Sequence, residues 1–299
     1  MATTESREGI QMLFKNNNFV TEYDVAEKVT SPFAKDLIAQ SGLGANANPA
    51  TPLTVLDNAC GTGIVSSILH RQLDDRVKGN WTLTCGDFSE AMLERTKHRM
   101  KEEGWMNAET KVVDAQNTQL PSASYTHVIT AFGYMVLPRS LDALDETCRI
   151  LQPGGTLASS TWIQPGWLLI IQKAIETMPG NLPWPTPSDF TGLLNNGEWD
   201  SATWVKSQLS QRGLEGVKAN VVTKKLSLTV PGFMKMATVM FPVVIQNFWT
   251  ADQRDKHGEE ARQFLQEYLI NTYGENGDVP MTWIAILATA RKPITEPGQ

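Results

Sequence analysis

The chain has 299 residues, of which 41% are hydrophobic and 19% charged, and its formal net charge is −6. This length can bury a substantial core, and the negative charge disfavours DNA, RNA and anionic membrane surfaces as partners, because proteins that bind polyanions are normally basic. We find no run of about 18 apolar residues, no secretory pattern at the N-terminus and no Cys-x-x-Cys pair. These features predict a cytoplasmic protein with reduced thiols, whose oligomeric state the sequence leaves open.

Helical patterns come first along the chain. Residues 10–43 are predicted to form helices, with Ser31 as an N-cap and Pro32 in the following first turn. Short apolar strands and helical spacings then alternate as far as residue 163. We predict strands at 55–56, 81–85, 110–113, 125–132 and after a Pro153-Gly154-Gly155 turn, and helices at 63–73, after Ser89 and at 139–150. This alternation predicts an α/β fold with parallel β-α-β units and helices on both faces of the sheet.

The rhythm changes after residue 163. Helices are predicted at 167–178, 203–212, 232–249 and 252–271, with an irregular stretch at 180–200. Two late strands are predicted at 217–228 and 279–292. The sheet is therefore expected to close with strands that flank a helical insertion.

A glycine-rich turn follows the first predicted strand, in the segment TVLDNACGTG at 54–63. Gly61 and Gly63 allow close approach of a ligand to the backbone, and the helix that begins there offers free N–H groups. The third glycine of the dinucleotide fingerprint is absent, which argues against an NAD-dependent oxidoreductase. An ordinary tight strand–helix turn is the alternative reading of this segment alone.

Acidic residues end three successive predicted strands. Asp57 precedes the glycine-rich turn, Asp87 lies in TCGDFSEAML, and Asp114 lies in VVDAQNTQLP. An acid at the end of the second strand can accept hydrogen bonds from ribose hydroxyls, and one at the third can accept from an adenine amino group. Each acid alone could be a solvated turn residue or a helix cap. Three of them beside one glycine-rich turn favour a nucleoside site, with Phe88 and Met92 placed to pack on a purine.

These motifs, together with LQPGG at 151–155, resemble the class I S-adenosylmethionine-dependent methyltransferases over residues 53–163. The resemblance implies a Rossmann-like seven-stranded sheet, mostly parallel with an antiparallel last strand, and a helical cap. It divides one compact domain into an N-terminal cap segment (1–50), a core that binds S-adenosylmethionine (51–163) and the remaining sheet with the cap (164–299). The family often has glycine where this chain has Ala59.

The resemblance also implies roles for individual residues. Asp57 is expected to help hold the methionine end of S-adenosylmethionine, Asp87 the ribose and Asp114 the adenine, while backbone at Ala131 and Phe132 lies under the sulfonium. Tyr23 matches an N-terminal tyrosine that often covers the methionine carboxylate. The complete set expected to contact the cofactor is Tyr23, Asp57, Ala59, Gly61, Gly63, Asp87, Phe88, Met92, Asp114, Ala115, Ala131 and Phe132.

A second resemblance covers nearly the whole chain, including the variable cap. It is carried by NACGTG, EEGWMNAETK, YTHVITAFGY, ASSTW, AIETMPGNLPWPT, FWTADQR and NTYGENGDVP, and it is to the fungal gliotoxin bis-thiomethyltransferases. It implies S-methylation of a reduced epidithiodioxopiperazine. Methyl transfer to oxygen, nitrogen or carbon of another apolar natural product is an alternative, as is a protein that binds the cofactor without transfer.

The predicted acceptor pocket lies above the strand ends and under the helical insertion. Its expected residues are Phe132, Tyr134, Met135, Trp162, Trp167 and Met240, although core packing is the alternative for each of them. We identify no certain catalytic residue and no metal site. His127 lies within a predicted strand and is interpreted as structural. A thiol acceptor, already partly ionised at neutral pH, suits a site that works by proximity and orientation.

Overall fold

The structure, a computed structural model, describes residues 24–44, 48, 50–194 and 197–294. In this part of the chain seven strands form one sheet in the order β3-β2-β1-β4-β5-β7-β6. The strands are β1 (Leu53–Asn58), β2 (Trp81–Asp87), β3 (Ala108–Val112), β4 (Tyr125–Ala131), β5 (Leu151–Gln164), β6 (Glu215–Thr229) and β7 (Asp278–Arg291). Strands β1 to β5 pair in parallel, and β7 runs antiparallel to both β5 and β6. The predicted Rossmann-like sheet with an antiparallel last strand is confirmed.

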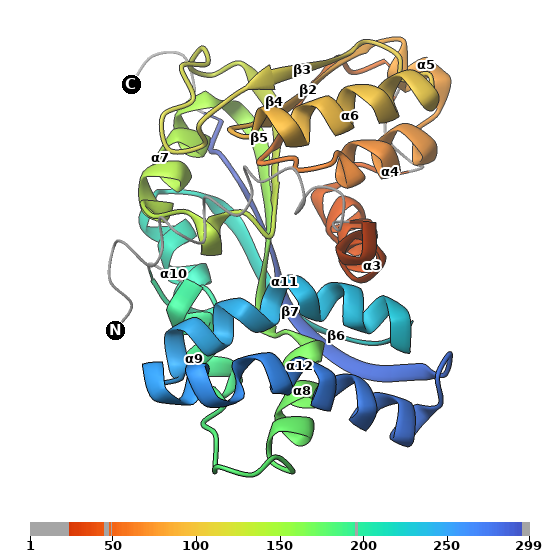
Figure 1. The fold of residues 1–299 in the computed structure, drawn as a ribbon. Helices are drawn as coiled ribbons and strands as arrows, with labels where there is room; N and C mark the ends of the chain where they lie inside the picture. Colours follow the sequence, from red (N-terminus) through yellow and green to blue (C-terminus); the bar gives the residue numbers. More distant parts are fainter. Residues whose placement is uncertain (1–23, 45–47, 49, 195–196, 295–299) are drawn as a thin grey trace.

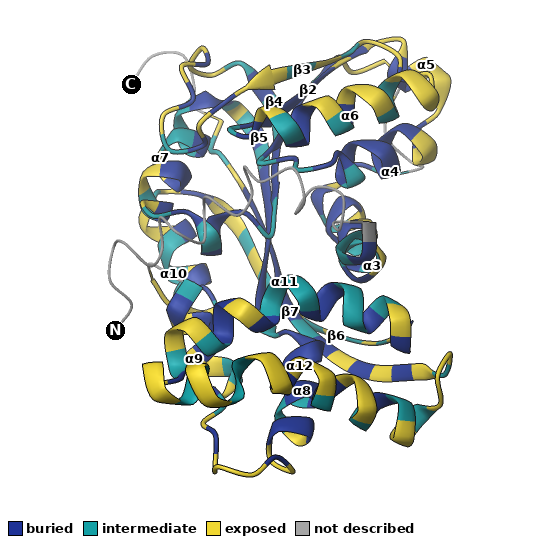
Figure 2. Ribbon diagram, in the orientation of Figure 1, coloured by how far each residue is buried: buried dark blue, intermediate teal, exposed yellow. Residues whose placement is uncertain are grey.

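Helices cover both faces of this sheet (Figure 1). On one side lie α3 (Asp24–Ser41), α4 (Ile64–Gln72), α5 (Asp75–Lys78) and α6 (Glu90–Glu102). On the other side lie α7 (Ser140–Ile150) and α10 (Ala202–Gln211), together with the short helix η1 (Tyr134–Val136) after β4. The central strands are therefore buried on both faces, which is why they read as near-continuous apolar runs. Leu56, Val128 and Leu157 are fully buried, and Figure 2 shows the middle of the sheet as buried.

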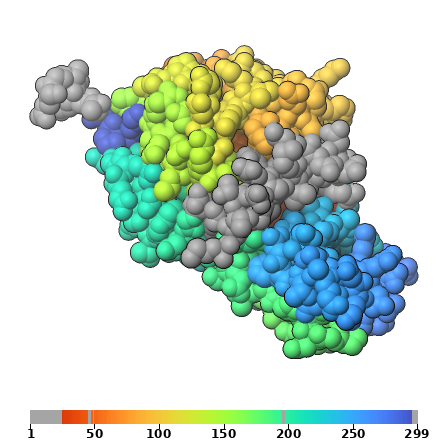
Figure 3. Space-filling model, turned by 60° about the vertical axis from the view of Figure 1, so that its left-hand side comes forward, coloured from red at the N-terminus to blue at the C-terminus, as the bar shows by residue number. Residues whose placement is uncertain are grey.

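The remaining helices form the cap. They are α8 (Gly166–Ile175), α9 (Pro187–Leu194), α11 (Val230–Phe248) and α12 (Ala251–Tyr273). The space-filling view shows the surfaces of α11 and α12 as a lobe beside the surface of the Rossmann-like part (Figure 3). The prediction of two helices between the late strands is confirmed, whereas α9 lies in a stretch that was expected to be irregular.

The predicted helix start at Ser31-Pro32 is wrong. Pro32 lies inside α3, which continues without interruption from Asp24 to Ser41. A proline in a helix interior costs about 3 kcal/mol, because its N–H is missing and its ring crowds the preceding turn. Phe33, Leu37 and Ile38 are fully buried in the same helix, and burial of each such side chain contributes about 1.5–3 kcal/mol. Tertiary packing therefore outweighs the local signal.

The Pro-Gly-Gly segment was also placed incorrectly, because it lies within β5 and not before it. The pairing of β5 with β4 shifts between Tyr125↔Leu151 and His127↔Thr156, so the segment forms a bulge in the strand. Gly154 has a φ of 79°, which a glycine adopts readily. The bulge explains why a turn-like sequence occurs in a long strand.

Candidate donor and acceptor site

The glycine-rich turn connects β1 to α4 through residues with left-handed backbone. Ala59, Gly61 and Gly63 have φ values of 55°, 56° and 79°. A Cβ at Gly63 would lie 2.9 Å from Cγ2 of Thr96, so the position has no room for a side chain. Ala59 tolerates a conformation that costs an L-residue about 1–2 kcal/mol, which gives a physical reason for glycine there in the family that the chain resembles.

Asp87 ties the end of β2 to this turn. Its Oδ2 accepts a hydrogen bond from the backbone N–H of Gly61 at 2.8 Å, and its Oδ1 accepts from the N–H of Ser89 at 2.9 Å. Burial raises the pKa of Asp87, and the backbone hydrogen bonds oppose that rise. The Ser89 side chain caps α6 by accepting from the N–H of Met92. The acid and the start of α6 therefore lie together beside the turn.

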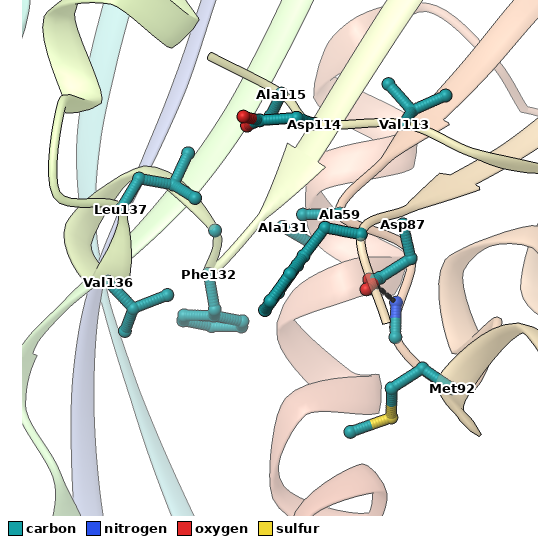
Figure 4. Close-up of a pocket in the computed structure, with 13 residues that line it drawn as sticks. Ala59, Asp87, Met92, Val113, Asp114, Ala115, Ala131, Phe132, Val136 and Leu137 are labelled. Atoms are coloured by element: carbon teal, nitrogen blue, oxygen red, sulfur yellow. Dashed lines mark hydrogen bonds between the residues drawn. The ribbon is translucent and has the colours of Figure 1, made fainter. Parts of the chain in front are cut away.

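A pocket opens where β1, β2 and β4 end (Figure 4). Figure 4 shows Asp114 and Phe132 at different ends of it, with Asp87 and Met92 along one side. The described residues that line it are Ala59, Gly61, Asp87, Phe88, Met92, Val113, Asp114, Ala115, Ala131, Phe132, Gly133, Val136 and Leu137. Nine of the twelve residues expected to contact the cofactor are in this set, so the structure brings most of the prediction together at one site.

Three expected cofactor residues are not among those that line the pocket. Gly63 lies at the start of α4, behind the turn. Asp57 is buried, and its Oδ2 accepts from the backbone N–H and the hydroxyl of Ser66, at 3.1 and 2.7 Å. Burial raises the pKa of Asp57 to about 7. Tyr23 lies outside the described residues.

The residues present fit S-adenosylmethionine. Asp87 and Asp114 offer carboxylate oxygens at two points, and the intervening surface is mainly apolar, as a purine and a ribose require. Asn58, next to Ala59, is fully buried, and neither polar atom of its side chain has a hydrogen-bond partner among the described residues. A buried polar group without a partner is rare in native structures and indicates a bound water or ligand.

Phe132 forms the apolar end of the pocket, with a φ of 55°. Its backbone N–H donates to the carbonyl oxygen and to Oγ of Ser160, at 2.9 and 3.1 Å. The ring stacks on Trp162, which is 8% exposed and lies behind Phe132. Of the six expected acceptor residues, Phe132 alone is among the described residues that line the pocket.

The other expected acceptor residues have core contacts. The Tyr134 hydroxyl lies 2.7 Å from the hydroxyl of Thr147 in α7, which points it away from the strand ends. The sulfur of Met135 accepts a hydrogen bond from the N–H of Trp162 at 3.3 Å. Trp167 packs edge-on against Phe190, and Met240 is half-buried in α11. Their contact with an acceptor stays a prediction.

Several lining residues were missed. Gly133, Val136 and Leu137 belong to the short helix η1 and its flanks, directly after β4. The one feature of the sequence that could have indicated these contacts is the small residue Gly133 directly after a predicted strand. Val113 was predicted as a strand residue and not as a contact. A Cβ at Gly133 would lie 2.7 Å from Cγ2 of Thr130, so close packing requires glycine at this position.

No histidine lines the pocket among the described residues. His127 lies four residues before the end of β4, about 13 Å along the strand. Burial, with a smaller contribution from Arg291, lowers the pKa of His127 to about 4, so it is neutral at physiological pH. This agrees with a structural role. The described residues contain no group of three or more His, Cys, Asp or Glu side chains placed to hold a metal ion.

Comparisons with known proteins agree with this geometry. Residues 55–155 match the model of a methyltransferase domain family. Methyltransferase tpcH of Aspergillus fumigatus is 43% identical over 284 residues, which cover 95% of this chain and 100% of that protein. The acetylaranotin bis-thiomethyltransferase of Aspergillus terreus is 43% identical over 288 residues, which cover 96% of this chain and 99% of that protein.

Solved structures share the fold. The phosphoethanolamine N-methyltransferase 2 of Haemonchus contortus, in complex with S-adenosyl-L-methionine, has a TM-score of 0.56 at 12% identity, covering 96% of this chain and 60% of that one. The 43% identity to the two fungal methyltransferases over nearly the full chain, together with this fold, shows that the chain belongs to the class I S-adenosylmethionine-dependent methyltransferases. It is an enzyme that takes its methyl group from S-adenosylmethionine. Along nearly its full length it is similar to fungal methyltransferases. In the described residues, no helix is both long enough and apolar enough to cross a membrane.

Proposed function

We propose that the enzyme methylates the thiols of a small reduced dithiol metabolite of the epidithiodioxopiperazine type. The observation that carries this proposal is the 43% identity to the acetylaranotin bis-thiomethyltransferase, which extends over 96% of this chain. That span includes the cap helices α8, α9, α11 and α12 as well as the cofactor-binding half. Cap residues are not needed to bind the donor, so similarity there supports a similar acceptor.

The pocket supports a placement for the donor. Asp87, at the end of β2, would accept hydrogen bonds from the ribose hydroxyls, and Asp114, beyond β3, would accept from the adenine amino group. Val113, Ala115 and Leu137 supply apolar surface between them. The methionine end would then lie toward Gly61 and the N-terminus of α4, which leaves the sulfonium beside Phe132.

The chemistry of the lining favours a thiol acceptor. When bound, S-adenosylmethionine supplies a methyl group on a positively charged sulfur, and transfer to a thiolate leaves S-adenosylhomocysteine and a thioether. The ionisable side chains among the described lining residues are Asp87 and Asp114, and both lie at the nucleoside part of the site. An alcohol would need a general base near Phe132, whereas a thiol with a pKa near 8.5 is already partly ionised at neutral pH.

The protein then contributes alignment and exclusion of water. Correct placement of two reactants can supply about 7–11 kcal/mol of the barrier in favourable cases. Phe132 is fixed by two hydrogen bonds to Ser160 and by its stack on Trp162, so it is a rigid wall against which an apolar acceptor can pack. The proton of the thiol leaves to solvent before transfer.

The test is an acceptor series that shares one carbon skeleton and differs only in the reacting atoms: a dithiol, the matching diol and the matching diamine. Each is incubated with the enzyme and isotope-labelled S-adenosylmethionine, and the products are analysed by mass spectrometry. We expect mono- and bis-S-methylated products from the dithiol and none from the other two. Methylation of the diol or diamine in place of the dithiol would overturn the proposal.

A further inference from the structure

Helix α3 reaches both halves of the proposed site. Its first turns carry Glu27 and, six residues or about 9 Å further along the axis, Phe33. Glu27 contacts the glycine-rich turn on the donor side. On the acceptor side Phe33 contacts Phe132, which forms the aromatic wall of the site, and Trp162 behind it. Neither residue lines the pocket.

The donor-side contact is a nearly buried ion pair joined to the turn. The carboxylate of Glu27 accepts a hydrogen bond from the hydroxyl of Thr62, which lies between Gly61 and Gly63 and is 1% exposed. Nη2 of Arg99, in α6, donates to Oε1 and Oε2 of Glu27 at 2.8 and 2.7 Å. Both side chains of the pair are 13% exposed, so solvent screens the interaction little. Arg99 thus fixes the carboxylate that holds Thr62.

Two further hydrogen bonds hold the same turn from within the Rossmann-like part. The N–H of Gly61 donates to Asp87, and the carbonyl of Gly61 accepts from the hydroxyl of Thr96 in α6, at 2.8 Å. Gly61, which makes both of these hydrogen bonds, also lines the pocket. A movement of Gly61 when a ligand binds would therefore pass to Thr62 and Glu27, and from there to α3.

The acceptor-side contact is made by a fully buried ring. The ring of Phe33 makes T-shaped contacts with the rings of Phe132 and Trp162. The centroid distances are 6.1 and 5.1 Å, and the interplanar angles are 89° and 90°. Asp36, one turn further along α3, pairs with Lys224 of β6 at 2.6 Å. The helix is thus fixed to the sheet on the side where the aromatic wall lies.

We propose that α3 couples donor binding to the acceptor wall, with Glu27 and Phe33 as positioning residues. The helix sets the separation between the glycine-rich turn and Phe132, and with it the alignment of the methyl group with the incoming sulfur. The acceptor half of this proposal rests on the proposed function. The donor half rests only on the site of a methyltransferase that uses S-adenosylmethionine.

The first measurement is the affinity for S-adenosylhomocysteine, by calorimetry, of the wild type, Thr62→Val and Thr62→Ser. Valine has nearly the shape of threonine and leaves the Glu27–Arg99 pair in place, whereas serine keeps the hydroxyl. We expect Thr62→Val to weaken binding at least about tenfold, because without the hydrogen bond to Glu27 the turn is no longer held in the conformation that binds the ligand, and Thr62→Ser to bind as the wild type does. Equal affinity of the wild type and Thr62→Val would overturn the proposal.

The second measurement is hydrogen exchange of α3, followed on peptides within residues 24–41, with and without saturating S-adenosylhomocysteine. In the wild type the ligand should slow exchange in α3 as well as in the turn at 57–67. In Thr62→Val and in Glu27→Ala, which removes the acceptor of the Thr62 hydroxyl, the ligand should still protect the turn but leave α3 unchanged. Equal protection of α3 in all three proteins, or no protection in the wild type, would contradict the coupling.

The third measurement separates this proposal from the proposed function. With dithiothreitol as the thiol acceptor, Phe33→Leu should lower kcat several-fold and leave the affinity for S-adenosylhomocysteine unchanged. An unchanged kcat in Phe33→Leu would overturn the acceptor half. If the wild type methylates no thiol, the proposed function fails, and the exchange measurement still decides whether α3 responds to the donor site.

Discussion

The ring of Phe132 stacks on the indole of Trp162, with ring centroids 4.0 Å apart and planes inclined by 19°. Phe132 lines the pocket, whereas Trp162 lies behind it and also contacts Trp283 at 5.1 Å. The indole therefore supports the wall that an acceptor would meet and does not itself form that wall. Packing of Trp162 within the sheet therefore helps to set the position of the Phe132 ring in the pocket.

Replacement of Trp162 tests that support. Trp162→Ala should lower the free energy of unfolding by about 3–5 kcal/mol, because a buried indole leaves a cavity among Phe33, Phe132 and Trp283. Trp162→Phe, which keeps a ring against Phe132, should lose less than half of that. Urea unfolding of the three proteins measures the difference. An alanine variant as stable as the wild type would show that the indole is not packed as described.

The two carboxylates of the pocket should differ in their importance for the donor. Asp87 is buried and joined to two backbone N–H groups, whereas Asp114 is exposed and bonds to Gln116. Asp87→Ala should weaken binding of S-adenosylhomocysteine by about 1.5–3 kcal/mol, because charged acceptors for the ribose are lost. Asp114→Ala should weaken it less, because solvent screens an exposed carboxylate. Calorimetry that ranks the two variants in the opposite order would refute these assignments.

Two glycines with left-handed backbone can be compared, Gly63 at the glycine-rich turn and Gly104 after α6. Gly63 and Gly104 have φ values of 79° and 63°. A Cβ at Gly63 would collide with Thr96, whereas no atom of the described residues lies within 4 Å of a Cβ at Gly104. Gly104→Ala should cost about 1–2 kcal/mol of stability from backbone strain alone. Gly63→Ala should cost more and should also weaken donor binding. Similar melting temperatures for the two variants would contradict the packing around Thr96.

The elements that sequence reasoning predicted well are those with strong periodicity. The alternation of strands and helices was predicted from Leu53 to Trp162, and the acids Asp57, Asp87 and Asp114, at or just beyond the ends of β1, β2 and β3, placed the pocket. The strand β3 itself is short and mostly exposed, so its polar residues gave only a weak signal. Positions set by tertiary packing were not predictable. Pro32 reads locally as a helix start, but burial of Phe33 and Leu37 carries α3 through it.

On the acceptor side of the site, too, positions set by tertiary packing could not be predicted from the sequence. Tyr134 and Met135 follow directly after β4, so they were natural candidates for the pocket. The turn of η1 points the Tyr134 hydroxyl to Thr147 and the Met135 sulfur to Trp162. Glu27 carried no sequence signal, because its partners Thr62 and Arg99 lie 35 and 72 residues away. Side-chain direction in a short turn and contacts between distant segments come only from the folded chain.

The buried carboxyl of Asp57 predicts a specific dependence of stability on pH. Burial raises its pKa from 3.8 to about 7, so in the folded state it keeps its proton between about pH 4 and pH 7, while the unfolded chain loses it. The unfolded state then binds fewer protons, and the free energy of unfolding falls as pH rises through this window. Above about pH 7 both states are ionised, and this contribution becomes constant.

Asp57→Asn isolates this effect from other groups, such as Glu146, whose pKa is lowered to about 2 mainly by its hydrogen bonds with Arg149. The stability of the wild type relative to Asp57→Asn should decline from pH 4 to pH 7 and then level off. Chemical unfolding of both proteins at several pH values gives this difference. A difference that does not change with pH would mean that Asp57 is ionised in the folded protein throughout the window.

The central claim is that the pocket between Asp87, Asp114 and Phe132 holds the methyl donor. A crystal structure of the enzyme with S-adenosylhomocysteine tests it most directly. We expect the ribose hydroxyls on Asp87, the adenine beside Asp114 and Val113, and the thioether sulfur facing the Phe132 end of the site. A ligand bound elsewhere, or bound here with its ribose away from Asp87, would contradict the account.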